Sequence, residues 1–89
     1  MPVISTFYGL IIRMFFYDDD RHHLPHIHVE YSGHEAVVAI DSGNVLEGSL
    51  PANKRKLLDA WMELHRDELI ADWTLAVSGE APAKIAPLV

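Results

Sequence analysis

The chain has 89 residues and a mass of 10.0 kDa, enough for one hydrophobic core, so we expect a single domain spanning residues 1–89. Hydrophobic residues make up 49% of the sequence and the mean hydropathy is +0.08, which excludes an intrinsically disordered chain. Seven basic and thirteen acidic residues give a net charge of −6, so unaided binding to nucleic acid is not expected. The absence of cysteine excludes disulfides, thiolate metal sites and cysteine nucleophiles.

The first half of the chain shows the short apolar patterns typical of β-strands. Residues 9–17 are apolar apart from Arg13, as expected of a strand covered on both faces. Residues 3–7 fit either a short strand or an extended lead-in, and the three aspartates at 18–20 fit a solvated turn. Residues 41–44 form a second tight turn before a last short strand.

Residues 26–31 alternate strictly between polar and apolar side chains, which predicts a strand with one polar face. Ser32-Gly33 suits a two-residue turn into the next strand. That register places Glu30 opposite Glu35, a like-charge pair that is unfavourable unless a cation lies near. A three-residue loop through His34 avoids this pair, so the sequence leaves the register open.

The second half of the chain has helical periodicity. Ser49 is the expected N-terminal cap, and Pro51 lies in the first turn. Asp67 either caps a second helix or lies in one helix that bends near Arg66, and Gly79 ends the helical segment. The first apolar stripe consists of Leu57, Leu58, Trp61, Leu64 and His65.

These elements predict an α+β fold: an antiparallel meander of three or four strands followed by two C-terminal helices packed on one face. The tail from residue 84 onward is expected to be extended and to lie against the sheet or a partner. The longest apolar run, residues 9–16, is too short to span a bilayer and contains Arg13, so no membrane segment is expected. A cytoplasmic location follows by default.

Five of the six histidines fall between residues 22 and 34. Strand geometry places His26, His28 and Glu30 on one face, where they could bind zinc or another divalent ion, with His22 or His23 completing the site. The catalytic hypothesis gives His26 and His28 the roles of general acid and base. The alternative is a solvated polar face that needs no ligand.

Arg13 lies among large apolar residues, where an unpaired guanidinium would be costly. Glu30, Glu35 or Glu47 on a neighbouring strand could pair with it, and this ion pair is favoured over binding of an anionic substrate.

The only basic run is Lys54-Arg55-Lys56 in the first helical turn. Positive charge there opposes the helix dipole, so this run is either a contact for phosphate or a partner, or a solvated helix face. Trp61 and Trp73 follow the helical stripe and are either core anchors or, if exposed, interface residues. His65 is expected to be bonded within the core.

Short segments spread over nearly the whole chain carry a family resemblance: Met1-Pro2-Val3-Ile4-Ser5, Phe7-Tyr8-Gly9, Pro25-His26-Ile27-His28-Val29, Glu47-Gly48-Ser49-Leu50-Pro51, Trp61, Leu64-His65, Glu68-Leu69, Trp73, Lys84-Ile85 and Pro87-Leu88. Together they resemble the bacterial family called domain of unknown function 4160. The segment around Ile27 is similar to the family's Pro-His-aromatic-His motif, with isoleucine in place of the aromatic residue. Both imidazoles are kept, and only stacking at the middle position is put in doubt.

The resemblance implies a small bacterial cytoplasmic protein of a toxin–antitoxin-like pair, with no established reaction. It also implies a small cognate partner resembling domain of unknown function 2442. We therefore predict a partner-binding component that forms a homodimer or a complex through a sheet edge or the helix–tail surface. The alternatives are a metal-dependent hydrolase or metal-free ribonuclease using His26 and His28, and a purely structural interaction module.

Overall fold

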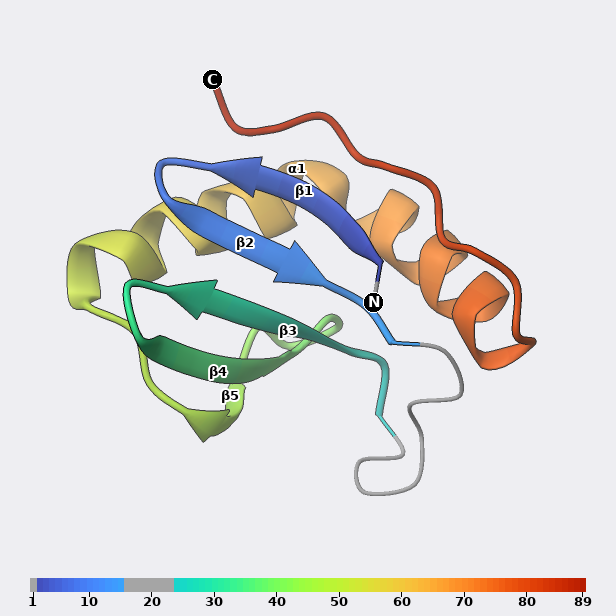
Figure 1. Cartoon of the computed structure of the whole chain (residues 1–89), viewed down its shortest axis with the longest axis horizontal. Coiled ribbons are helices and arrows are strands. Elements are labelled where there is room, and N and C mark those ends of the chain that lie inside the picture. Colours follow the sequence, from blue (N-terminus) through green and yellow to red (C-terminus); the bar gives the residue numbers. More distant parts are fainter. Residues whose placement is uncertain (1, 16–23) are drawn as a thin grey trace.

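A computed structural model describes residues 2–15 and 24–89 of the chain. The described residues form five strands and one helix: β1 (Val3–Phe7), β2 (Leu10–Arg13), β3 (His26–Tyr31), β4 (His34–Ala39), β5 (Val45–Gly48) and α1 (Ala52–Val77). The strands pair antiparallel in chain order, and α1 lies across one face of the sheet (Figure 1). The predicted α+β meander is confirmed, although the numbers of strands and helices differ from the prediction.

The additional strand is β1, which the sequence left as either a strand or a lead-in. Tyr8 and Gly9 have φ values of 49° and 83° and form a two-residue turn between β1 and β2. Gly9 therefore belongs to a turn and does not begin a long strand, and β2 ends at Arg13. The predicted strand 9–17 was too long, and its last two residues and the aspartates at 18–20 lie outside the described residues.

Of the two registers that the sequence allowed for the β3–β4 hairpin, the structure has the one with a two-residue turn. Ser32 and Gly33 have φ values of 43° and 84° and form the two-residue turn, so Glu30 is the cross-strand partner of Glu35. The three-residue loop through His34 is wrong, because His34 is the first residue of β4.

One helix replaces the two that were predicted. The segment contains no glycine or proline that would stop it, and Asp67 lies inside it. The backbone is non-helical only at His65 (φ −119°, ψ 20°), next to the position where the alternative prediction placed a bend. The expected cap at Ser49 is wrong, since Pro51 occupies the N-cap position and no side chain caps the helix.

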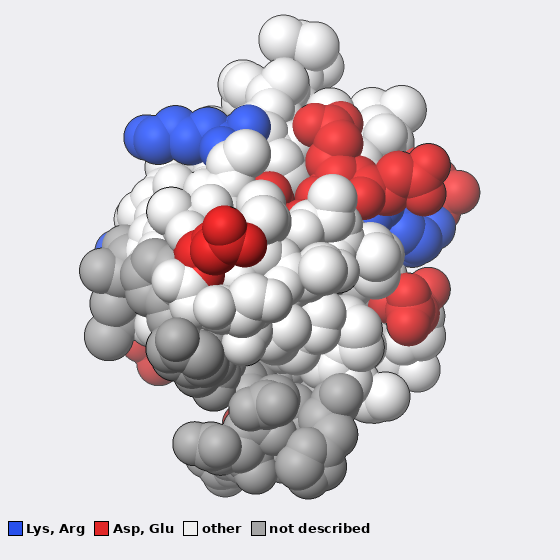
Figure 2. Space-filling view, turned by 90° about the vertical axis from the view of Figure 1, so that its right-hand side faces the viewer, with Lys and Arg blue, Asp and Glu red and all other residues white. Residues whose placement is uncertain are grey.

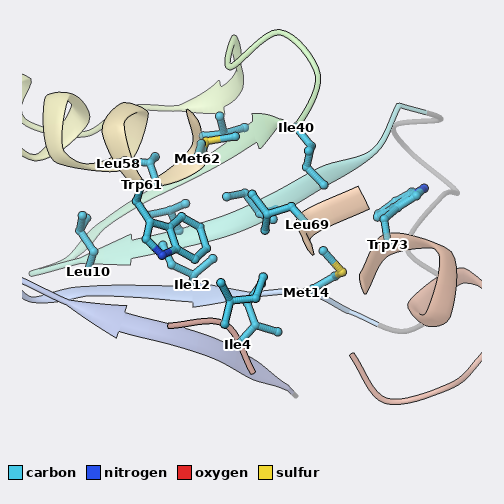
Figure 3. Close-up of a cluster of buried hydrophobic side chains, with 14 of the residues drawn as sticks. Ile4, Leu10, Ile12, Met14, Ile40, Leu58, Trp61, Met62, Leu69 and Trp73 are labelled. Carbon is cyan, nitrogen blue, oxygen red and sulfur yellow. The ribbon is translucent and has the colours of Figure 1, made fainter. Parts of the chain in front are cut away.

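The core lies between α1 and the sheet (Figure 3). Trp61, Leu58 and Leu69 from the helix pack against strand residues such as Leu10 and Ile12. The prediction that Leu64 belongs to the buried stripe is wrong, because its side chain is 69% exposed. At 100° per residue, Leu64 points about 120° away from the mean direction of the buried helix residues.

The C-terminal tail lies against the sheet and the helix, as the sequence predicted. Trp61 Nε1 donates a hydrogen bond to the Ala86 carbonyl oxygen at 2.8 Å, and Ile85 N donates to the carbonyl oxygen of Ile4 on β1 at 2.8 Å. Farther back along the tail, Ala83 N donates to Asp72 Oδ1 at 2.9 Å. These bonds hold the tail beside the β1 edge of the sheet (Figure 1).

Candidate functional site

The face of the sheet opposite α1 carries polar side chains from four neighbouring strands. No element among residues 2–15 and 24–89 covers it in the way that α1 covers the other face. A depression of ≈ 390 Å³ lies on it, and we call this depression the sheet groove. Its lining residues are Phe15, His28, Val29, Glu30, Glu35, Ala36, Val37, Glu47 and Gly48.

Two cross-strand rows of side chains form this surface. The first row runs across four strands and consists of Glu47, Val37, His28 and Arg13. The second row contains the carboxylates of Glu35 and Glu30. Residues two apart on a strand are about 7 Å apart, so the two rows are within reach of one long side chain. The rows place carboxylates at the β4–β5 end of the groove and the guanidinium at the β2 end.

Arg13 forms the ion pair that its position predicted. Its Nε donates to Glu30 Oε1 at 3.0 Å, and the two side chains are 25% and 38% exposed. Glu35 lies opposite Glu30, is exposed, and has no ion-pair partner among the described residues. The cation therefore neutralises one member of the like-charge pair, and the groove keeps negative charge toward β4.

The two candidate catalytic histidines have different environments. His26 is 2% exposed, its Nδ1 lies 2.7 Å from the Leu24 carbonyl oxygen, and its ring centroid lies 4.9 Å from that of Trp73. His28 lines the groove and meets the Phe15 ring edge-on, with the centroids 4.3 Å apart. The two imidazole centroids are 5.4 Å apart. Only His28 is thus placed to meet a ligand in the groove.

The zinc set of His26, His28 and Glu30 stays a prediction. In the part of the chain that the structure describes, no three His, Cys, Asp or Glu side chains gather closely enough to hold a metal ion. Zinc requires all its ligand atoms within about 2.0–2.3 Å of one point, and the Glu30 carboxylate is instead turned toward Arg13. The suggested additional ligands, His22 and His23, lie outside the described residues.

The basic run at the start of α1 is largely engaged in contacts within the chain. Lys54 Nζ donates to the Tyr8 carbonyl oxygen at 2.9 Å and lies 4.8 Å from the centre of the Tyr31 ring. Arg55 donates to a carbonyl oxygen in the β4–β5 turn. These contacts fasten the helix to two turns of the sheet, and Lys56 is the exposed member of the run.

Both tryptophans are core anchors. Trp61 is 0% exposed and Trp73 is 9% exposed, so neither is offered to a partner on the surface of this fold. His65 is half-buried beside the Trp61 ring, but its Nδ1 lies 2.6 Å from Glu68 Oε1, and that carboxylate is exposed. The expectation that His65 bonds within the core is therefore wrong.

Sequence reasoning missed two features. Phe15 was assigned to a strand without a face, although its spacing of two from Arg13 could have placed it on the polar side. Asp72 is 3% exposed; burial raises the pKa of its carboxyl, the hydrogen bond from Ala83 N opposes this, and nearby Glu68 adds to it. Its position next to Trp73 in the apolar stripe is the pattern that could have identified it.

A five-stranded antiparallel sheet with a single helix on one face and an acidic groove on the other defines a small α+β domain. The family model described as Domain of unknown function (DUF4160) matches residues 9–74, well over half of the chain, and the chain belongs to this family. No curated protein and no solved structure matches it. None of the helical segments that the structure describes has the length and apolar character needed to cross a membrane.

Proposed function

We propose that this protein is the partner-binding component of a toxin–antitoxin-like pair and that it holds a small partner protein against the sheet groove. The observation that carries the proposal is the groove itself, a depression of ≈ 390 Å³ on the sheet face opposite α1. It combines apolar contact area on Val37 and Phe15 with carboxylates that fix orientation. Such a mixed surface supports protein binding more than it supports a reaction.

The charge of the chain supports a protein partner. A net charge of −6 disfavours unaided contact with RNA or DNA phosphates, since the basic run at the start of α1 is largely used within the chain. Figure 2 also shows several acidic side chains and few basic ones on the side where α1 ends. The proposed partner is a small cognate protein resembling domain of unknown function 2442, in a bacterial cytoplasm. A homodimer through a sheet edge is the second form of association.

The enzyme alternative gains no support from the site. A metal-free ribonuclease would need two imidazoles that reach one substrate, whereas His26 is 2% exposed and packs beside Trp73. A metal-dependent hydrolase would need a ligand set that the described residues do not assemble. We therefore base the proposed function on binding.

The test is co-expression with the protein encoded by the neighbouring gene, followed by calorimetric titration of the purified pair. Val37→Asp places a further negative charge in the middle of the groove and is expected to weaken binding at least about tenfold. The matched control is Leu64→Asp on the exposed side of α1, which should leave affinity unchanged. Circular dichroism confirms that both variants fold.

Two results would contradict the proposal. Loss of binding in Leu64→Asp but not in Val37→Asp would place the interface on the helix. Failure of the wild-type protein to bind the neighbouring protein, with no growth phenotype when either is expressed alone or both together, would remove the proposed pairing.

A further inference from the structure

The β4–β5 end of the sheet groove has an apolar centre surrounded by carboxylates. Val37 is half-buried and faces Glu47 on one side and His28 on the other as its cross-strand partners. Glu35 precedes Val37 by two residues on the same strand and so lies on the same face. Gly48 on β5 also lines this end of the groove. A ligand group entering here meets aliphatic carbon first and carboxylate oxygen at the rim.

The carboxylate of Glu35 at this end is not paired with the neighbouring cation of β2. Arg13 belongs to the far end of the same cross-strand row and donates to Glu30. Glu35 remains exposed and without an ion-pair partner in the described part of the chain, directly opposite Glu30. Two carboxylates facing each other destabilise a sheet when no cation lies between them. A second cation arriving at Glu35 would relieve this repulsion.

We propose that the β4–β5 end of the sheet groove receives a lysine or arginine side chain from an extended segment of the partner protein. This inference rests on the proposed function and names the chemistry by which that partner is recognised. The aliphatic stem of a long cationic side chain packs on Val37 while its charged head reaches Glu35 and Glu47. The net charge of −6 adds attraction at longer range.

The probe is a blocked peptide of alternating lysine and valine, titrated into the ¹⁵N-labelled full chain and followed by NMR. Amide shift changes are expected at Glu35, Val37, Glu47 and Gly48, and they should weaken as salt is raised. A peptide with norleucine in place of lysine tests the charge, because it keeps the aliphatic stem. The exposed acidic side of α1, with Asp59, Glu63 and Asp67, is the internal reference for attraction by net charge alone.

The matched variants are Glu35→Gln in the groove and Glu80→Gln in the exposed turn after α1. Each variant removes one negative charge, so both change the net charge by the same amount. Glu35→Gln should weaken peptide binding about fivefold, whereas Glu80→Gln should leave it within error. Equal effects of the two variants, equal binding of the norleucine peptide, or shifts centred on α1 would each overturn the inference.

The outcome separates this inference from the proposed function. Groove binding of the cognate protein together with no lysine-peptide shifts at Glu35 and Val37 would keep the proposed function and reject the cationic side chain. Specific shifts there together with no capture of a cognate protein would support the cation site and reject the pairing.

Discussion

The charge arrangement on β2, β3 and β4 makes a quantitative prediction about stability. Arg13 Nε lies 3.0 Å from Glu30 Oε1, and Glu30 faces Glu35 across the β3–β4 hairpin. The Arg13 and Glu30 side chains are 25% and 38% exposed, so water partly screens their attraction. We expect Arg13→Met to lower the free energy of unfolding by about 1 kcal/mol, equivalent to about 5 °C in the melting temperature.

The same substitution should unmask the repulsion between the two glutamates. In the wild-type protein, Glu35→Gln is expected to raise the free energy of unfolding by about 0.3 kcal/mol, because Arg13 already neutralises Glu30. In the Arg13→Met background the same change should gain about 0.8 kcal/mol. The coupling of about 0.5 kcal/mol between residues 13 and 35 is the quantity to be measured by a double-mutant cycle.

Urea unfolding followed by the fluorescence of the two buried tryptophans gives all four free energies. The coupling should shrink in about 1 M salt, where the screening length is about 3 Å. If Glu35→Gln has the same effect in both backgrounds, or if salt leaves the coupling unchanged, Arg13 does not act as the cation that permits the Glu30–Glu35 register.

Three further predictions concern the frame of the site. Gly48→Ala should lower the free energy of unfolding by more than about 2 kcal/mol, because φ is +76° and the added Cβ would lie 1.9 Å from a β4 carbonyl oxygen. The control Gly43→Ala, at φ +75° with open space around it, should lower it by only about 1 kcal/mol, and equal losses in urea unfolding would contradict the clash. Trp61→Phe should lower the free energy of unfolding by about 1–2 kcal/mol and release the tail, so that the Ile85 amide exchanges its hydrogen faster. Unchanged exchange would mean that the hydrogen bond to the Ala86 carbonyl oxygen does not hold the tail. Because burial raises the pKa of the Asp72 carboxyl, the native state binds its proton more tightly than the unfolded chain does, so the stabilisation from this group is lost as pH rises through its folded pKa. The free energy of unfolding of Asp72→Asn, measured in urea, should therefore increase relative to that of the wild type from about pH 4 upward. A difference that stays constant with pH would refute this.

Much of the local structure was determined by the sequence alone. The strict alternation of residues 26–31 predicted β3 and the polar face of its histidines. Ser32-Gly33 suggested the turn that the structure contains, but the Glu30–Glu35 pair left the register open until the structure was known. The apolar periodicity around Trp61 predicted a buried helix face. These features depend on neighbours a few residues apart, so period and turn chemistry were sufficient. Leu64 was the exception, because apolar character was given more weight than helical phase.

Only the tertiary structure decided which distant groups meet. The sequence offered Glu30, Glu35 and Glu47 as partners for Arg13, and strand order selected Glu30. Docking of α1 buried both tryptophans and used most of the basic run to fasten the helix. The opposite face of the sheet has no such cover among the described residues. The physical reason is that a charge or an aromatic ring has the same local pattern whether it is paired, buried or exposed. The neighbours that settle the matter come from strands and helices far along the chain.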